Sequence, residues 1–128
     1  MIRLITLLCS LFYILQLSGS LSAQDTARYE WDLTDIYVDA SDWQSALDQV
    51  SLRITEFQNL KGSLGVNAQA FLRVMSEYSD LNKEAARVYV YTSLQRDADQ
   101  REPEAQARFG LARQMYTDLT AGLSWINP

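Results

Sequence analysis

From about residue 41 onwards, apolar residues recur every three or four positions, a spacing that predicts long amphipathic helices. The longest such run covers about 67–94. Its predicted core face consists of Phe71, Met75, Tyr78, Leu81, Ala85, Val88, Tyr89 and Thr92. At about 1.5 Å per residue, this helix is on the order of 40 Å long, the full width of a domain of this size. The other elements are therefore expected to pack around it.

The end of this long helix allows a second interpretation. Residues 88–94, VYVYTSL, are β-branched and aromatic, which also suits a strand. The preceding KEAAR contains strong helix formers and neither Gly nor Pro, so we favour a continuous helix. Val90, Tyr91 and Leu94 point away from the main apolar line. A second packing partner is expected on that side.

An earlier helix is predicted over about 42–60. Ser41 and Gln44 have the spacing of a capping box, and Asp42 lies in the first turn, where the helix dipole favours negative charge. Its buried face is predicted to consist of Trp43, Leu47, Val50, Ile54 and Phe57. Gly62 suits the left-handed position after the helix, and the short connector makes this helix an antiparallel neighbour of the next.

The third helix is predicted over about 103–124. The long helix, about 68–96, begins at the cap Asn67 and stops in a polar run, after which Pro103 suits a first helical turn. Glu104 and Arg108 form a supporting pair one turn apart. The predicted buried face consists of Ala105, Phe109, Ala112, Tyr116, Leu119 and Leu123. The predicted fold is all-α, with three long antiparallel helices.

Two terminal segments complete this organisation. Before the first helix lies an extended aromatic segment. Trp31 in this segment and Trp43 in the first helix are expected to act as anchors that fasten the two together. The last residues, Trp125 and Ile126 among them, are unusually apolar for a domain end. We expect a C-terminally truncated chain in which these two are core residues whose partners follow.

The N-terminus has the pattern of a secretory signal peptide over 1–23. Arg3 precedes an apolar run of about 13 residues and then small residues, with cleavage expected after Ala23 or alternatively after Ser20. The run is shorter than the roughly 20 residues of a membrane span, and an uncleaved anchor is the alternative. The mature domain, 24–128, is therefore expected to be periplasmic or extracellular. Cleavage also removes Cys9, the one cysteine.

Charge and composition exclude several function classes. The chain has 16 acidic and 11 basic residues, and the acid excess lies in 25–56, so no basic face for nucleic acid is expected. The absence of histidine excludes Ser-His-Asp catalysis and His-containing zinc sites. Asp32 and Asp35 have no neighbours that would separate their pKa values. The acidic cluster Asp97, Asp99, Glu102 and Glu104 lacks the pattern of an EF-hand loop and is predicted to be a solvated turn. No catalytic or metal-binding residue is predicted.

The order of several short motifs resembles the start of oligoendopeptidase F, in the family of zinc metallopeptidases related to thimet oligopeptidase. The motifs are Trp31-Asp32-Leu33 with Tyr37, Lys61-Gly62-x-Leu64, and Tyr89-x-Tyr91 followed by the turn at Asp97 and Asp99. The resemblance implies an all-helical N-terminal part that forms one wall of a channel for short peptides. It also implies a zinc ion held by a His-Glu-x-x-His helix much later in such proteins, and none of those positions exists here.

The expected function follows from this resemblance. The chain is expected to be the N-terminal segment of a larger exported peptidase, with the remainder packing on the second and third helices. Tyr91 is the candidate residue for lining the substrate channel, with a core role equally open, whereas Tyr89 is favoured as a core residue. The alternative is a stand-alone secreted three-helix binding or scaffold protein without enzymatic activity.

Overall fold

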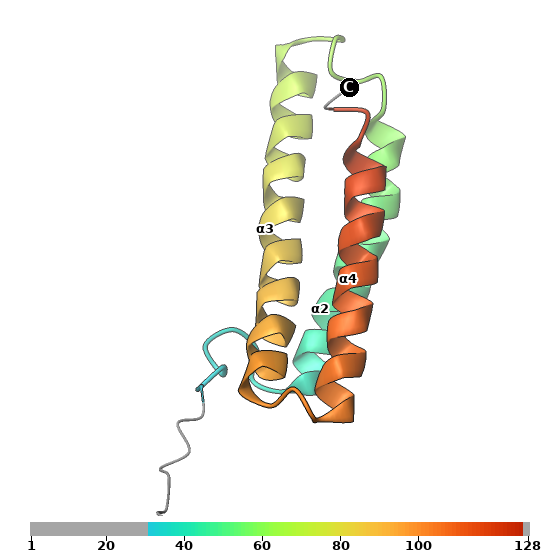
Figure 1. The fold of residues 1–128 in the computed structure, drawn as a ribbon. Coiled ribbons are helices and arrows are strands. Elements are labelled where there is room, and N and C mark those ends of the chain that lie inside the picture. Colours follow the sequence, from blue (N-terminus) through green and yellow to red (C-terminus); the bar gives the residue numbers. More distant parts are fainter. Residues whose placement is uncertain (1–30, 127–128) are drawn as a thin grey trace, which may run out of the picture.

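The computed structural model describes residues 31–126, and in this range the protein is built from three α-helices. Helix α2 (Ala40–Phe57) continues into the short 3-10 helix η1 (Gln58–Leu60), and is followed by α3 (Ala68–Ala98) and α4 (Pro103–Leu123). The three helices lie side by side in one bundle (Figure 1). The predicted all-α class is confirmed, and residues 88–94 are helical. The described range contains no strand.

The N-terminus of α2 corrects one prediction. The cap is Asp39 and not Ser41: the Asp39 Oδ1 accepts hydrogen bonds from the backbone N–H groups of Ser41 (2.7 Å) and Asp42 (3.0 Å). The Ser41 hydroxyl also donates to this oxygen, at 2.6 Å. Because one carboxylate satisfies two of the free N–H groups, the helix begins earlier than the capping-box pattern predicts. Gln44 instead donates to Asp48.

The other helix boundaries agree with the sequence pattern. The Asn67 side chain accepts from the backbone N–H of Ala70 at 2.8 Å, which caps α3. Pro103 is the first residue of α4, and Glu104 and Arg108 form an ion pair at 3.5 Å. Gly62 has a φ of 89°, so it supplies the left-handed conformation that the turn after η1 requires.

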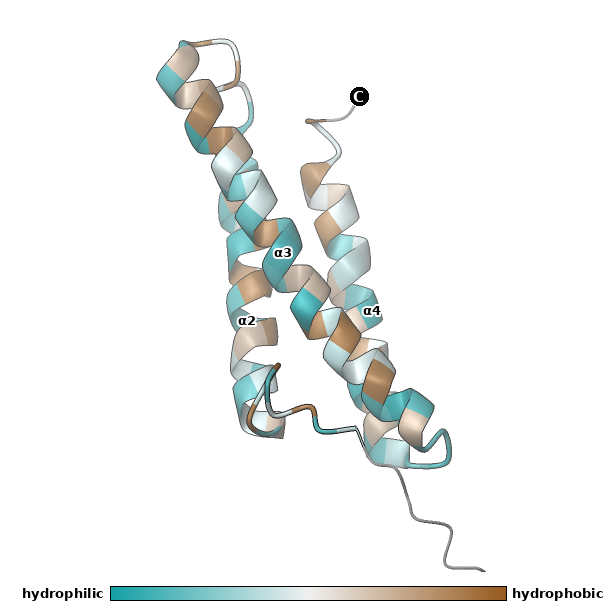
Figure 2. Cartoon of the chain, turned by 90° about the vertical axis from the view of Figure 1, so that its left-hand side faces the viewer, coloured by the Kyte–Doolittle hydropathy of each residue, from teal (hydrophilic) through white to brown (hydrophobic). Residues whose placement is uncertain are grey.

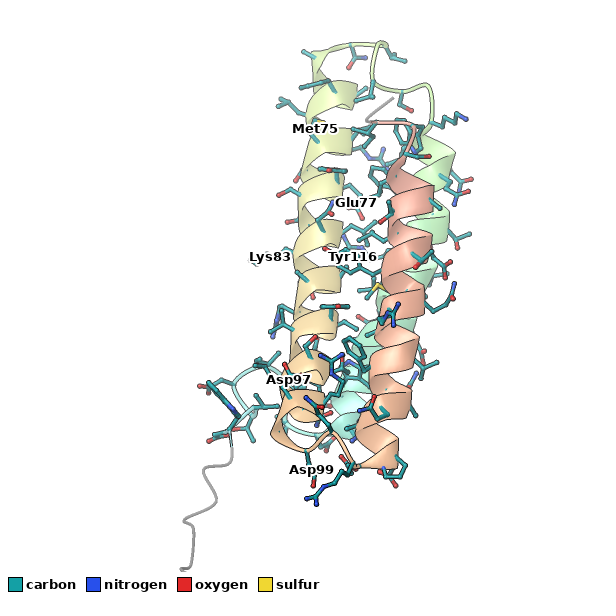
Figure 3. The ribbon with its side chains drawn as sticks, in the orientation of Figure 1. Met75, Glu77, Lys83, Asp97, Asp99 and Tyr116 are labelled. Atoms are coloured by element: carbon teal, nitrogen blue, oxygen red, sulfur yellow. The ribbon has the colours of Figure 1, made fainter. Side chains whose placement is uncertain are left out.

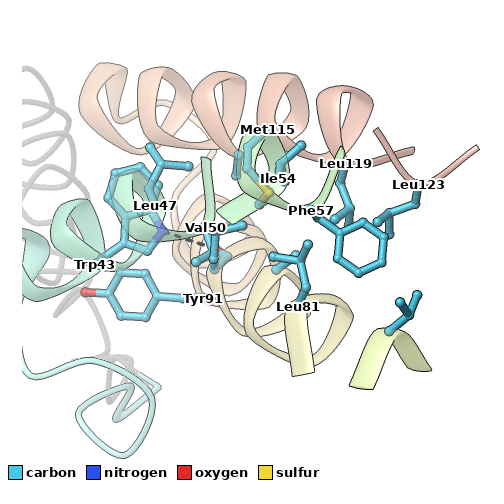
Figure 4. Packing of buried hydrophobic residues seen from close by; sticks show 14 residues of the cluster. Trp43, Leu47, Val50, Ile54, Phe57, Leu81, Tyr91, Met115, Leu119 and Leu123 are labelled. Carbon is cyan, nitrogen blue, oxygen red and sulfur yellow. Dashed lines mark hydrogen bonds between the residues drawn. The ribbon is translucent and has the colours of Figure 1, made fainter. Parts of the chain in front are cut away.

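The core lies where the three helices meet. The five residues predicted for the buried face of α2 are all buried, and Figure 4 shows them facing Leu81 and Tyr91 of α3 and Met115, Leu119 and Leu123 of α4. The Trp43 indole N–H donates to the carbonyl of Val88 at 3.1 Å. Arg53, which follows Trp43 on α2, donates to Glu77, which precedes Val88 on α3. The order of contacts is therefore reversed between the two helices, so they run in opposite directions.

The buried faces of α3 and α4 differ in part from the predicted ones. On α3, Val74 and Tyr91 are buried, whereas Phe71 is 47% exposed and Met75, Tyr78 and Tyr89 are only half-buried. The cause is that α2 packs against one flank of α3, so the residues of that flank are buried. On α4, Met115 is buried in place of Tyr116, which is 39% exposed, because α4 also packs against α2.

The segment before α2 packs on the bundle, but not through its first aromatic residue. Trp31 is 68% exposed, so the prediction that it acts as an anchor is wrong. Tyr37 has that role: its ring meets Tyr91 edge to face, with centroids 5.3 Å apart. Arg87 reinforces the contact by donating to the carbonyl of Ile36 at 3.0 Å. The prediction of a buried anchor is correct for Trp43.

Two terminal predictions remain. The signal peptide over 1–23 and its cleavage at Ala23 lie outside the described residues. Within 31–126, no helix is long and apolar enough to cross a membrane.

Trp125, near the C-terminus, was predicted to be a core residue whose partners follow the chain. Its ring stacks on Phe57 with a centroid distance of 5.4 Å, so it has at least one core partner within this chain.

Candidate functional site: the groove between α3 and α4

Helices α3 and α4 diverge as they leave the turn that connects them. Figure 2 shows α3 crossing the bundle obliquely, close to α4 near residues 98–103 and close to α2 at its other end. The divergence leaves a groove made of two adjoining hollows of about 430 and 260 Å³. Tyr116 and Thr120 line both hollows, so they form one continuous feature. We call it the α3–α4 groove.

Tyr89 and Tyr116 line the α3–α4 groove and pack in an aromatic cluster with the buried Phe109. The Tyr89 ring lies 5.5 Å from that of Phe109 and 5.3 Å from that of Tyr116, in tilted arrangements that suit aromatic pairs. Figure 3 places Tyr116 between the two helices. Tyr78 and Leu123 extend the apolar lining towards the wider end. The groove therefore presents a surface suited to apolar side chains.

The polar groups of the groove are mostly satisfied within their own helices. The Thr117 and Thr120 hydroxyls donate to carbonyls one turn earlier, at 3.1 and 2.9 Å, and Asn82 does the same to Tyr78 at 2.7 Å. Arg113 is the one charged side chain that lines either hollow, and it has no ion pair within the described range. Among the residues that line the two hollows, no nucleophile lies beside an activating base.

The structure does not bring Tyr91 to this groove. Its side chain is 4% exposed and lies against Tyr37, on the flank of α3 that faces away from Tyr89. Burial raises the pKa of the Tyr91 hydroxyl above its ordinary value, which keeps it neutral over the physiological range. Substrate contact by Tyr91 stays a prediction. The sequence pattern missed Tyr116 and Arg113, since Tyr116 has the spacing of a core residue and Arg113 that of a solvated one.

The other acidic candidates are held in local interactions. Asp32 accepts from both the backbone N–H (3.0 Å) and the hydroxyl (2.6 Å) of Thr34, and these bonds lower the pKa of its carboxyl. Asp97 pairs with Arg96 at 2.9 Å, and Asp99 with Arg101 at 3.3 Å. In residues 31–126, no three His, Cys, Asp or Glu side chains are grouped so as to hold a metal ion.

The described residues thus form an all-helical domain with a partly apolar groove between α3 and α4. Comparison with known proteins shows which sequences this domain resembles. No protein-family model matches the sequence, and no solved structure does. Group B oligopeptidase PepB from Streptococcus agalactiae is 25% identical over 101 residues, which cover 79% of this chain and 17% of that protein. The chromosomal oligoendopeptidase F from Lactococcus lactis subsp. cremoris is 26% identical over 99 residues, or 77% of this chain and 16% of that protein.

The plasmid-encoded oligoendopeptidase F of the same subspecies is also 26% identical, over 90 residues. These similarities confirm the resemblance of the chain to the N-terminal region of oligoendopeptidase F. The chain spans about a sixth of the length of the curated relatives that it matches.

Proposed function

We propose that this chain is the helical N-terminal segment of an exported, oligoendopeptidase F-like zinc metallopeptidase that acts on short peptides. The observation that carries the proposal is the similarity of 70–79% of the chain to four proteins, all named as oligopeptidases or oligoendopeptidase F. The small share of each relative that is matched supports a parent protein several times longer than 128 residues.

The zinc ion of such an enzyme would have to be held elsewhere in the parent protein. The chain has no histidine, and the described residues offer no metal-binding group, so the residues present do not fit a zinc site. No catalytic step is therefore assigned to them. By itself, the chain is proposed to be inactive.

The proposed role of this segment is to form one wall of the peptide channel. Three packed helices, one of them 31 residues long, provide a stiff surface, which is what a channel needs in order to exclude folded proteins. The remainder of the peptidase would pack on α3 and α4. Burial disfavours Tyr91, the one candidate residue for lining the channel, since reaching a substrate would require displacing Tyr37.

Export through a cleaved signal peptide is part of this proposal. It rests on the N-terminal sequence pattern, with cleavage after Ala23. The intact mass of the protein recovered from its native host would test it. A mature protein that begins at Gln24 supports export, whereas a protein that retains residues 1–23 would indicate an uncleaved anchor.

The deciding experiment is to read the DNA beyond the codon for Pro128. An open frame that continues to a His-Glu-x-x-His helix supports the peptidase assignment, and a stop codon at this point overturns it. Hydrolysis of a quenched-fluorescent oligopeptide provides a second test. The 128-residue chain should be inactive, and chelator-sensitive hydrolysis by the chain itself would contradict the proposed inactivity.

A second candidate function is a stand-alone secreted binding or scaffold protein. It is favoured by the core, which draws buried residues from all three helices and is continuous along the bundle. This alternative requires a stop codon after Pro128 and a monomer that unfolds in one cooperative transition.

A further inference from the structure

One side of α3 carries an apolar stripe that the described chain leaves partly uncovered. Phe71, Met75, Tyr78 and Tyr89 fall on the same side of a 3.6-residue repeat, and Tyr78 and Tyr89 line the α3–α4 groove. None of the four is fully buried, and Phe71 is among the most exposed large apolar residues of α3. A stripe of this regularity is normally covered along its whole length by another element.

We propose that the α3–α4 groove binds one amphipathic helix, which presents aliphatic side chains to the aromatic lining and a carboxylate side chain to Arg113. The source of that helix rests on the proposed function: it is a segment of the remainder of the parent peptidase. The groove and its chemistry are independent of that source.

The shape of the groove suits a helix. Its lining on α4 extends from Arg113 to Leu123, which corresponds to roughly 15 Å, or about three turns of a facing helix. Figure 2 shows α3 and α4 moving apart along this length, and the two hollows follow one another there, so a helix can lie along them on the surface. Apolar anchors three and four residues apart on such a helix would reach Tyr78, Tyr116 and Leu123 in turn.

The charge of the groove specifies the polar contact. Arg113 has no ion pair in the described range, and the other lining residues are uncharged. A helix that covers the groove would remove this guanidinium from water, which is unfavourable unless the helix brings a carboxylate to it. Arg binds a carboxylate through two parallel N–H···O bonds, which also sets the register of the helix.

The test uses two synthetic helical peptides of about 16 residues, with leucines at positions that form one stripe. They differ at one central position, which is Glu in one and Lys in the other. Fluorescence anisotropy measures their binding to the purified 128-residue protein. We expect the Glu peptide to bind about tenfold more tightly than the Lys peptide, and Arg113→Glu to reverse that preference.

The matched control is Lys83→Glu, which makes the same charge change on the outer side of α3, away from α4 (Figure 3). This variant should keep the preference for the Glu peptide. The proposal is overturned if neither peptide binds, if the two bind equally, or if Arg113→Glu and Lys83→Glu behave alike. It is also overturned if sedimentation shows that a second copy of the chain occupies the groove, with self-association lost in Tyr116→Ser. A stop codon after Pro128, together with binding of the Glu peptide, would refute the proposed function and leave the groove assignment standing.

Discussion

The two flanks of α3 differ in how completely they are covered. On the flank that faces α2, the Trp43 indole and the Val88 carbonyl form a hydrogen bond at 3.1 Å, and Arg53 and Glu77 form a half-buried ion pair at 2.7 Å. On the flank that faces the α3–α4 groove, Tyr89 and Tyr116 pack on each other but remain partly exposed. The contacts on the first flank are buried or half-buried, whereas the second flank retains exposed apolar surface.

This contrast separates stability from binding. Side chains that are fully buried in the folded chain stabilise it, because unfolding would expose their apolar surface to water. Partly exposed side chains contribute less to folding and retain area that a partner can bury. Substitutions on the two flanks are therefore expected to affect different measurements.

The largest expected effect is that of Trp43→Ala. It removes a fully buried ring and leaves the Val88 carbonyl without its indole donor, so the free energy of unfolding should fall by about 3–5 kcal/mol. Urea denaturation of the purified protein measures it. The matched control is Trp31→Ala, which should change stability by less than about 0.5 kcal/mol because that side chain is exposed. Equal losses in both variants would mean that the segment before α2 packs more tightly than the structure indicates.

Next in size is the difference between two positions on α3 that share the predicted core stripe. Leu81→Ala should cost about 2–5 kcal/mol, since Leu81 is fully buried against α2 and α4. Phe71→Ala should cost less than about 1 kcal/mol, because about half of its surface is already exposed. Thermal unfolding of both variants checks the difference. A large loss in Phe71→Ala would show that this end of the apolar stripe on α3 is covered in solution, for example by self-association.

A smaller effect is expected where α4 approaches α2. A Cβ atom at Gly122 would lie 2.9 Å from the Cγ2 methyl of Ile54, and this branched side chain is stiff. Gly122→Ala should therefore destabilise the protein by about 1–3 kcal/mol through overpacking. In contrast, Gly110→Ala meets no atom within 4 Å, and should stabilise α4 by up to about 1 kcal/mol, since Ala is the better helix former. Opposite signs in urea denaturation would verify the close approach of the two helices.

The smallest expected effect concerns pH and the Asp39 cap of α2. Hydrogen bonds from Ser41 and Asp42 lower the pKa of the Asp39 carboxyl below its ordinary value of 3.8. A depressed pKa in the folded state means that the cap stabilises the protein above the ordinary value, and that this contribution is lost as the pH falls through the lowered one. Asp39→Ala should therefore lower the thermal midpoint at pH 7, and this difference should shrink as the pH is lowered below 3.8. A difference that does not shrink with acidification would refute this role of the carboxylate.

The sequence pattern predicted the α2 flank better than the groove. The buried face of α2 was predicted completely because α2 packs with a single apolar line, and one line can be read from spacing alone. Tyr116 and Met115 illustrate the opposite case. Both are near the core side of α4, and which of them is buried depends on where α2 lies, which spacing does not specify.

The candidate site was missed for the same reason. Tyr89 and Tyr116 have the spacing of core residues, and the divergence of α3 from α4 leaves both partly exposed in a groove. Tyr91 was predicted to lie off the main face, and it does, but the segment before α2 covers it through Tyr37. That contact joins residues distant in the sequence, and no local pattern indicates it.

The sequence by itself determined the three helices, most of their caps and the resemblance to oligoendopeptidase F, because these depend on neighbours within a few positions and on the order of short motifs. The tertiary structure decided which side of each helix is buried and where the α3–α4 groove opens. The reason is geometric: an amphipathic helix specifies an apolar arc, and the angles at which its partners cross it determine how much of that arc is covered.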